Sequence, residues 1–262
     1  MKGFVSALWT ETLKMRRSKV PLLSATGFSI APLVGGLFMV ILKDPEAARS
    51  MGLISTKAQL VAGTADWTTF FGFISQATAI GGAIVFAIVT AWVFGREFSD
   101  HTAKELLALP TSREAMIGAK FSVIAAWTSL LSIFIFLLGL LVGRLVDIPG
   151  WSTALLGSAF GDALGSAGLT IALLPFVALM ASVGRGYLPS FGWTLLTVFL
   201  AQIAAAMGWG DWFPWSVPAL FSGAAGPRGE LLGFHSYVIV ILASAISITA
   251  TFYWWRSADQ TR

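Results

Sequence analysis

Six long apolar runs dominate the sequence, and each is long enough to cross a lipid bilayer as a helix. A hydrocarbon core about 30 Å thick needs roughly 20 helical residues at about 1.5 Å per residue. Only 11% of the 262 residues are charged, against about 25% in a soluble domain. We therefore expect an all-α integral membrane protein with one transmembrane domain over residues 1–262. The expected spans are 20–42, 70–94, 121–142, 165–183, 188–208 and 236–255.

The segment 154–164 is ambiguous, because it is too short to cross a bilayer alone and contains Asp162. It could extend the fourth span outward or lie at the membrane surface. A carboxylate at the bilayer centre would mark a functional site. Neighbouring glycine and serine residues favour a wet or closely packed position at the outer interface instead, so a transport pathway through Asp162 is the less favoured interpretation.

The distribution of Lys and Arg predicts the orientation of the chain. Twelve lie in the N-terminal segment, in 95–120, in the turn 184–187 and in the C-terminal tail, and five lie in the loops of the other side. Since basic residues concentrate on the inner side, we expect both termini in the cytoplasm. The first apolar run is too long for a cleaved signal sequence and should remain as an anchor in the cell membrane.

Residues 1–19 read as an amphipathic helix that lies in the membrane interface. Apolar residues from Phe4 to Leu13 can share one helical face, and cations collect where the first span begins. A simpler alternative is a basic stop signal that only sets topology, and both can hold. The expected membrane-interface residues are Trp9, Lys14, Arg16, Arg17 and Lys19.

The stretch GREFSDHTAKELLALPTSREAMIGAK, residues 95–120, holds four basic and four acidic side chains between the second and third spans. Two capping boxes, each a Thr with a Glu three residues later, flank Pro110. They predict a short helix over 103–108 and a second helix that starts at Ser112 and continues into the third span. The capping pairs are Thr102 with Glu105 and Thr111 with Glu114.

This segment is longer than a turn between two membrane helices requires. We expect Phe98 to point one way with Leu106 and Leu109. Its charged side chains should remain accessible to solvent or to a partner, and those singled out are Glu97, Asp100, Lys104 and Arg113. A docking surface for another protein fits best, and a plain turn with solvated charges is the alternative.

Three stretches resemble the permease subunits of type-2 ABC exporters, especially the bacitracin and lantibiotic-immunity kind: TETLKMRRSK, FGREFSDHTAKELLALPTSR and GWGDWFPWSVPAL. The resemblance extends to chain length and to the number and order of spans. In that family the second stretch is a coupling helix seated in a groove of the ATP-binding subunit. The resemblance implies coupling contacts at Arg96, Glu97, Phe98, Asp100, Thr102, Lys104, Glu105, Leu106, Leu107, Pro110, Arg113 and Glu114.

The chain has no GxxxxGK[ST] phosphate loop, so we expect ATP and Mg²⁺ to be bound by a separate cytoplasmic ATPase subunit and no cofactor by this chain. The resemblance implies at least two permease subunits, identical or related. It also implies export of an amphipathic molecule such as an antimicrobial peptide or a drug. We expect no enzymatic activity and no metal site, because there is no cysteine and His101 and His235 lie in loops on opposite sides. Nucleic acid is not an expected partner.

The loop 209–235 is rich in aromatic residues, which favours anchoring at the outer interface over a gate at the exit of a pathway. Two other functions remain open. A transporter driven by an ion gradient usually needs several ionisable groups inside the membrane, and Asp162 alone is weak support. A scaffold or sensor could bind a partner through 95–120 without moving a solute. The candidate gate residues are Trp209, Trp212, Phe213 and Trp215, with Asp162.

Overall fold

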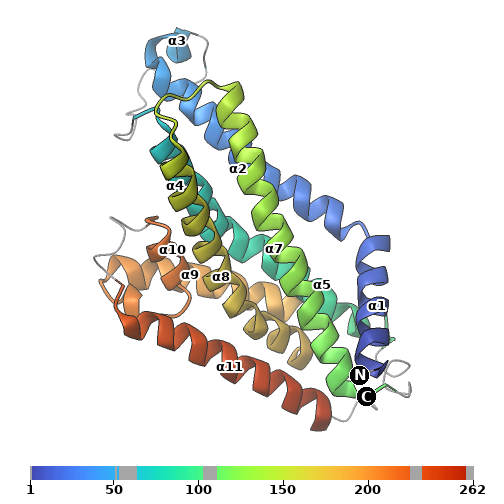
Figure 1. Ribbon diagram of the computed structural model, residues 1–262. Helices are drawn as coiled ribbons and strands as arrows, with labels where there is room; N and C mark the ends of the chain where they lie inside the picture. The colour runs from blue at the N-terminus through green and yellow to red at the C-terminus, as the bar shows by residue number, and fades with distance from the viewer. Residues whose placement is uncertain (1, 51, 53–63, 103–110, 225–231, 258–262) are drawn as a thin grey trace.

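Six helices of membrane-crossing length form the body of the protein in the computed structural model (Figure 1). The structure describes every residue except 1, 51, 53–63, 103–110, 225–231 and 258–262, and the described residues contain no β-strand. The expectation of an all-α integral membrane protein with six spans is confirmed. The crossing helices are α2 (Val20–Lys43), α4 to α5 (Trp67–Ser99), α7 (Arg113–Leu145), α8 (Thr153–Val183), α9 (Tyr187–Ala206) and α11 (Phe234–Ser257).

Shorter helices lie at the two ends of this bundle. α1 (Lys2–Arg17) precedes the first crossing helix, and α3 (Pro45–Ser50) follows it at the opposite end. In Figure 1, α1 and the last turn of α11 lie at the same end of the molecule. We call this the α1 end and the opposite one the α3 end. The loop before α11 contains a 3₁₀ turn, η2 (Gly210–Trp212), and α10 (Val217–Phe221).

Three of the crossing helices are longer than a bilayer requires. The α4 to α5 unit and α7 have 33 residues each and α8 has 31, which at about 1.5 Å per residue gives roughly 46 to 50 Å. Polar side chains start two of these helices, because Asp66 accepts a hydrogen bond from Thr69 N and Ser152 from Leu155 N. The ambiguous segment 154–164 therefore extends the fourth span as the first third of α8.

A π-helical turn, η1 (Ala77–Gly81), joins α4 (Trp67–Gln76) to α5 (Gly82–Ser99). Such turns insert one extra residue into a helix and change the faces that its two halves present. Ser75, just before this turn, exchanges a hydrogen bond of 2.8 Å with Ser166 of α8. The turn thus lies where the second and fourth spans are joined by buried polar atoms.

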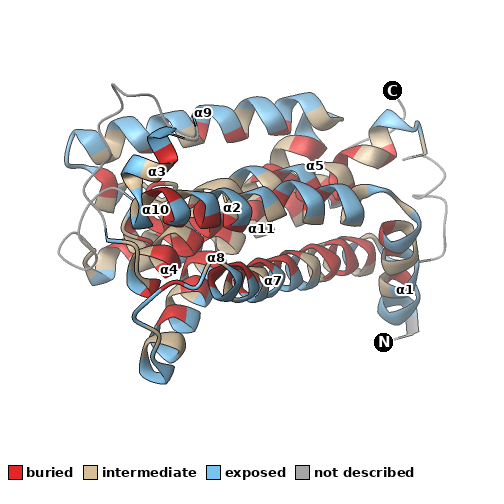
Figure 2. Cartoon of the chain, turned by 90° about the horizontal axis from the view of Figure 1, so that it is seen from above, coloured by how far each residue is buried: buried red, intermediate tan, exposed pale blue. Residues whose placement is uncertain are grey.

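The two largest of the five apolar clusters among the described residues lie toward opposite ends of the bundle, and Figure 2 shows the buried residues along the inward faces of the helices. Toward the α1 end, the cluster includes Phe28, Phe86 and Trp255. Toward the α3 end, the Trp67 ring is fully buried and lies over Gly143, where a β-carbon would be 2.4 Å from the ring. Packing of this kind, with a glycine facing a large ring, brings two membrane helices close together.

Candidate functional site

The segment between α5 and α7 begins with a helix end formed without glycine. Backbone hydrogen bonds run from His101 N to Phe98 O and from Thr102 N to Glu97 O, which is the Schellman pattern. His101 supplies the left-handed residue, with φ of 57°. As a result Arg96, Glu97 and Phe98 are part of α5 and are held rigidly in it.

Glu97 is buried in a cluster of four charges that joins α1, α5 and α7. It is only 4% exposed, and its Oε1 lies 2.8 Å from Lys14 Nζ and 3.0 Å from Lys120 Nζ. Glu11 on α1 completes the cluster, at 2.8 Å from Lys14 and 3.3 Å from Lys120. Two carboxylates and two ammonium groups balance, so the charge cluster carries no net charge.

Lys120 is the most deeply buried member, with 1% of the residue exposed. Its ammonium group also donates to Val93 O at 2.8 Å, and the Thr102 hydroxyl donates to Glu97 Oε2 at 3.0 Å. Buried ions persist only when nearly all of their hydrogen-bonding capacity is satisfied. These extra bonds supply that satisfaction, and they join the start of the 100–112 segment to α7 and α1.

Lys14 lies at the edge of the charge cluster, on α1. Burial alone would lower its pKa, but the neighbouring Glu11 carboxylate, and then Glu97, raise the pKa above its ordinary value of 10.5. Lys14 therefore stays charged at neutral pH, and the ion pairs that hold α1 to α5 stay intact.

The other end of the segment is held to α11. Ser112 caps α7 by accepting from Ala115 N at 3.3 Å. Arg113, the first residue of α7, donates to Trp255 O at 3.0 Å and Arg256 O at 3.1 Å. A guanidinium group on the last carbonyls of a helix also interacts favourably with the helix dipole. The segment 100–112 is therefore attached to α1 and α7 on one side and to α11 on the other.

Aromatic packing strengthens both attachments. The Phe98 ring lies 5.9 Å from the ring of Trp254 and 5.6 Å from that of Trp255, centroid to centroid. The Trp255 indole in turn donates to the Ser182 hydroxyl at 2.9 Å. The ends of α5, α8 and α11 thus meet in one rigid junction at the α1 end.

Two expectations about 95–120 need correction. Glu97 is not accessible to a partner, because lysines 83 and 23 residues away in the sequence neutralise and bury it. Thr111 does not cap α7, since the adjacent Ser112 has the extended backbone and the bond that a cap requires.

The other described charges of the segment lie nearer the surface. Asp100 is exposed, as expected, and pairs with Arg96 at 3.1 Å. Arg113 is half-buried, and Glu114 pairs with Arg256 at 3.4 Å. The predicted helix 103–108, with Lys104, Glu105, Leu106, Leu107, Leu109 and Pro110, lies outside the described residues.

Sequence reasoning missed Glu11 and Lys120 as partners of Glu97. Glu11 sits in an otherwise apolar and basic helix, and Lys120 is the last charge before a long apolar run. A charge in such a position needs a partner of opposite sign, and that signal could have suggested the pairing.

The N-terminal helix lies on the bundle, as its amphipathic pattern suggested. Ala7 and Met15 pack inward, with Ala7 against α7, whereas Trp9 is 61% exposed and free to contact lipid. Arg16, Arg17 and Lys19 are exposed. Lys14 differs from these because it turns toward the bundle to bind Glu97.

The aromatic residues of the loop before α11 separate into two groups. Trp209 and Trp212 are mostly exposed, and Trp212 stacks on His235, which lies 3.0 Å from Asp211. Trp215 instead packs with Phe213 and with Phe176 and Trp193 of α8 and α9. The two groups occupy different environments, so only the first has the exposure that an interface anchor or a gate would need.

Asp162 lies half-buried on α8, 21 residues before its last residue Val183. At about 1.5 Å per residue this is roughly 31 Å of helix, close to the thickness of the hydrocarbon core. This length favours a membrane interface at the α3 end for Asp162, and its expected position on the outer side and its role stay predictions. In the described part of the chain, no group of three or more His, Asp or Glu side chains could hold a metal ion.

Six apolar crossing helices with a rigid polar junction at one end define a multi-pass membrane protein. The chain belongs to the ABC-2 transporter family, whose model, described as "ABC-2 family transporter protein", matches residues 7–201. It is also similar to the bacitracin transport permease protein BCRB of Bacillus licheniformis, with 25% identity over 179 residues that cover 68% of this chain and 85% of the relative. The chain is therefore a permease subunit of an ABC transporter.

Proposed function

We propose that this permease exports an amphipathic molecule, such as an antimicrobial peptide or a drug, and that a separate cytoplasmic ATPase drives it through the segment between α5 and α7. Similarity to a bacitracin transport permease supports this substrate class. The wide apolar faces of the crossing helices suit a cargo that enters from the bilayer. Two permease subunits, identical or related, would form the transporter, and ATP and Mg²⁺ would be bound by the ATPase.

The observation that carries the mechanical part of the proposal is the double attachment of 100–112. At its start, Glu97 is bound to Lys14 and Lys120. At its end, Arg113 is bound to the last turn of α11. A push on this segment would therefore move α1, α5, α7 and α11 together, because the contacts at each end are short and largely buried. A plain solvated turn would not need these attachments.

A charge reversal at the exposed end of α5 tests the docking step. Asp100→Arg changes an exposed residue, and we expect at least a tenfold weaker complex between the permease and its ATPase. Asp147→Arg is the matched control, because Asp147 is also exposed and lies at the opposite, α3 end of the bundle. Both variants should fold, and co-purification of the two subunits gives the binding readout.

Equal binding of the ATPase by both variants would contradict docking at this segment. Transport assays in vesicles then separate the alternatives. Movement of substrate without the ATPase would favour a transporter driven by an ion gradient. Binding of the ATPase with no stimulation of its hydrolysis by any substrate would favour a scaffold or sensor.

A further inference from the structure

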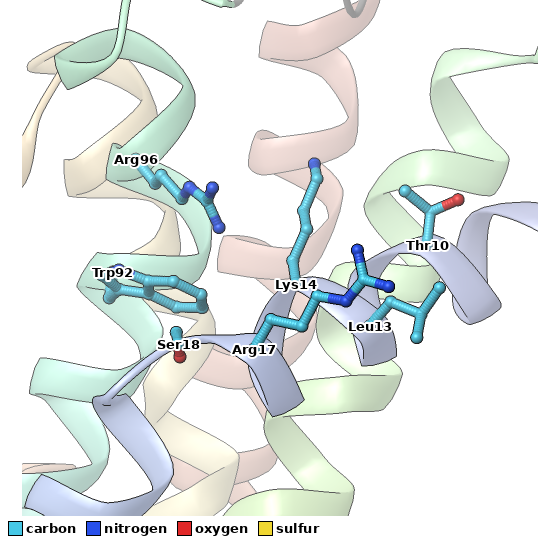
Figure 3. Close-up of a pocket in the computed structure, with 7 residues that line it drawn as sticks. All are labelled: Thr10, Leu13, Lys14, Arg17, Ser18, Trp92 and Arg96. Atoms are coloured by element: carbon cyan, nitrogen blue, oxygen red, sulfur yellow. The ribbon is translucent and has the colours of Figure 1, made fainter.

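A pocket of about 560 Å³ lies between α1 and α5 on the outer side of the charge cluster (Figure 3). Its α1 wall is a single helical face, formed by Thr10, Leu13, Lys14 and Arg17 at spacings of three and four residues. Its α5 wall is formed by Trp92 and Arg96, one turn apart. The volume falls within the range of about 300 to 1,000 Å³ that small-molecule sites occupy.

The charge of the pocket wall is wholly positive. Lys14, Arg17 and Arg96 line it, and no lining residue is acidic. The nearest carboxylates lie outside the lining but pair with two of its cations: Glu11 and Glu97 are shared between Lys14 and Lys120, and Asp100 pairs with Arg96. The lining itself presents three cations and no carboxylate, which favours the binding of an anion.

The cations have hydrogen-bond donors left for a ligand. An ammonium group has three N–H donors, and Lys14 uses two of them on Glu11 and Glu97. Arg96 contacts Asp100 through Nε only, which leaves its terminal nitrogens. Arg17 is exposed at the opposite wall. Guanidinium groups bind phosphate oxygens through paired hydrogen bonds, so a phosphate is the anion that matches this set.

Trp92 gives the pocket an apolar side and fixes one of its cations. The Arg96 guanidinium carbon lies 5.1 Å from the centre of the Trp92 ring, within the range of a cation–π contact. In Figure 3 both side chains project from α5 toward α1. Together with Leu13, the indole would contact the uncharged part of a ligand whose phosphate meets the cations.

We propose that this pocket binds the phosphate of an anionic phospholipid headgroup. The pocket lies at the end of the bundle where α1 presents Trp9 and further cations to the membrane surface, so a headgroup can reach it without leaving the bilayer. A bound lipid would bridge Arg17 on α1 and Arg96 on α5, next to the ion pairs between Lys14 and Glu97. It would therefore add a removable link between the interfacial helix and the second span.

Titration of the purified full-length protein with phosphatidylglycerol, followed by native mass spectrometry, tests this site. We expect one tightly bound lipid, and Arg17→Gln should weaken it about tenfold, the usual effect of losing a charged hydrogen bond. Arg16→Gln is the matched control, because it removes the same charge from the neighbouring exposed position but lines a different, largely apolar groove with Leu8 and Trp127. Its effect should be below about twofold.

Equal losses in the two variants would overturn the proposal, since they would indicate general attraction to a basic helix. A competition experiment identifies the source of the phosphate. Short-chain phosphatidylglycerol should displace the bound lipid, whereas inorganic phosphate at the same concentration should have little effect. Equal displacement by inorganic phosphate would overturn the lipid as the ligand.

Discussion

Lys120 Nζ lies 3.0 Å from Glu97 Oε1, so α7 and α5 are joined by an ion pair that is closed to solvent. The same ammonium group reaches Glu11 on α1. The Lys120 ammonium group therefore joins three helices that are separate in the sequence, α1, α5 and α7. It lies at the centre of the proposed coupling junction.

Removal of this charge should destabilise the protein strongly. Lys120→Met leaves Glu97 without its most buried partner, and we expect a loss of about 3–5 kcal/mol in the free energy of unfolding. Thermal unfolding in detergent measures it. The double variant Lys120→Met/Glu97→Gln should recover part of the loss, because it removes one of the two carboxylates left without a full set of partners. A double variant as unstable as Lys120→Met alone would contradict the pairing.

The stability contributed by Lys14 should depend on pH only under basic conditions. Its pKa is raised above 10.5 in the folded protein, so its contribution is fully present below that value and is lost as the pH rises through the higher, folded-state pKa. The difference in melting temperature between the native protein and Lys14→Met should stay constant from about pH 6 to 9 and shrink above about 10.5. A difference that already shrinks below pH 9 would contradict this assignment.

Close packing of α7 on the second span makes Gly143 sensitive to substitution. A methyl group there would overlap the buried Trp67 ring, and we expect Gly143→Ala to lower the free energy of unfolding by about 1–3 kcal/mol. Gly168→Ala is the control, because a β-carbon at that exposed helical position meets no atom within 4 Å. It should leave stability unchanged or raise it by up to about 1 kcal/mol. Unfolding in detergent distinguishes the two, and equal effects would argue against the packing.

Orientation can be measured with single cysteines, since the chain has none of its own. Asp100→Cys lies in the segment that we expect inside the cell, and Trp209→Cys lies in the exposed aromatic loop. A membrane-impermeant maleimide added to intact cells should label Trp209→Cys only. Asp100→Cys should react after the membrane is made permeable. The reverse pattern would show that the chain has the opposite orientation.

The number and order of the spans could be predicted from the sequence because apolar length alone determines which helices can cross a bilayer. Helix ends were harder to predict. Residues 96–99 continue α5 past the expected end of the second span at residue 94, since pairing with distant charges removes the cost of burying Glu97. At the other end of the segment, the expected helix from Ser112 into the third span agrees with α7, which begins at Arg113. Residues 154–164 similarly form the start of α8, and their composition did not distinguish that outcome from a surface segment.

The candidate site was predicted in location but not in detail. Local patterns found the mixed-charge segment and a helix start within one residue of Ser112. They could not predict that Glu97 points inward. Its partners lie on α1 and α7, and the spacing of residues within one helix does not indicate which residues of other helices it will contact. The C-terminal end of α5 could not be predicted for a different reason: His101 adopts the left-handed backbone conformation that glycine usually adopts at a helix end.

The described chain begins with α1 and finishes with the last turn of α11, and both lie at the α1 end of the molecule. A reporter fused to either terminus would therefore face the same compartment, and a pair of fluorophores at the two termini would report on α1 and α11. If the junction at Glu97 and Arg113 moves during the ATP cycle, the distance between those fluorophores would follow the stroke directly, without any label inside the bundle.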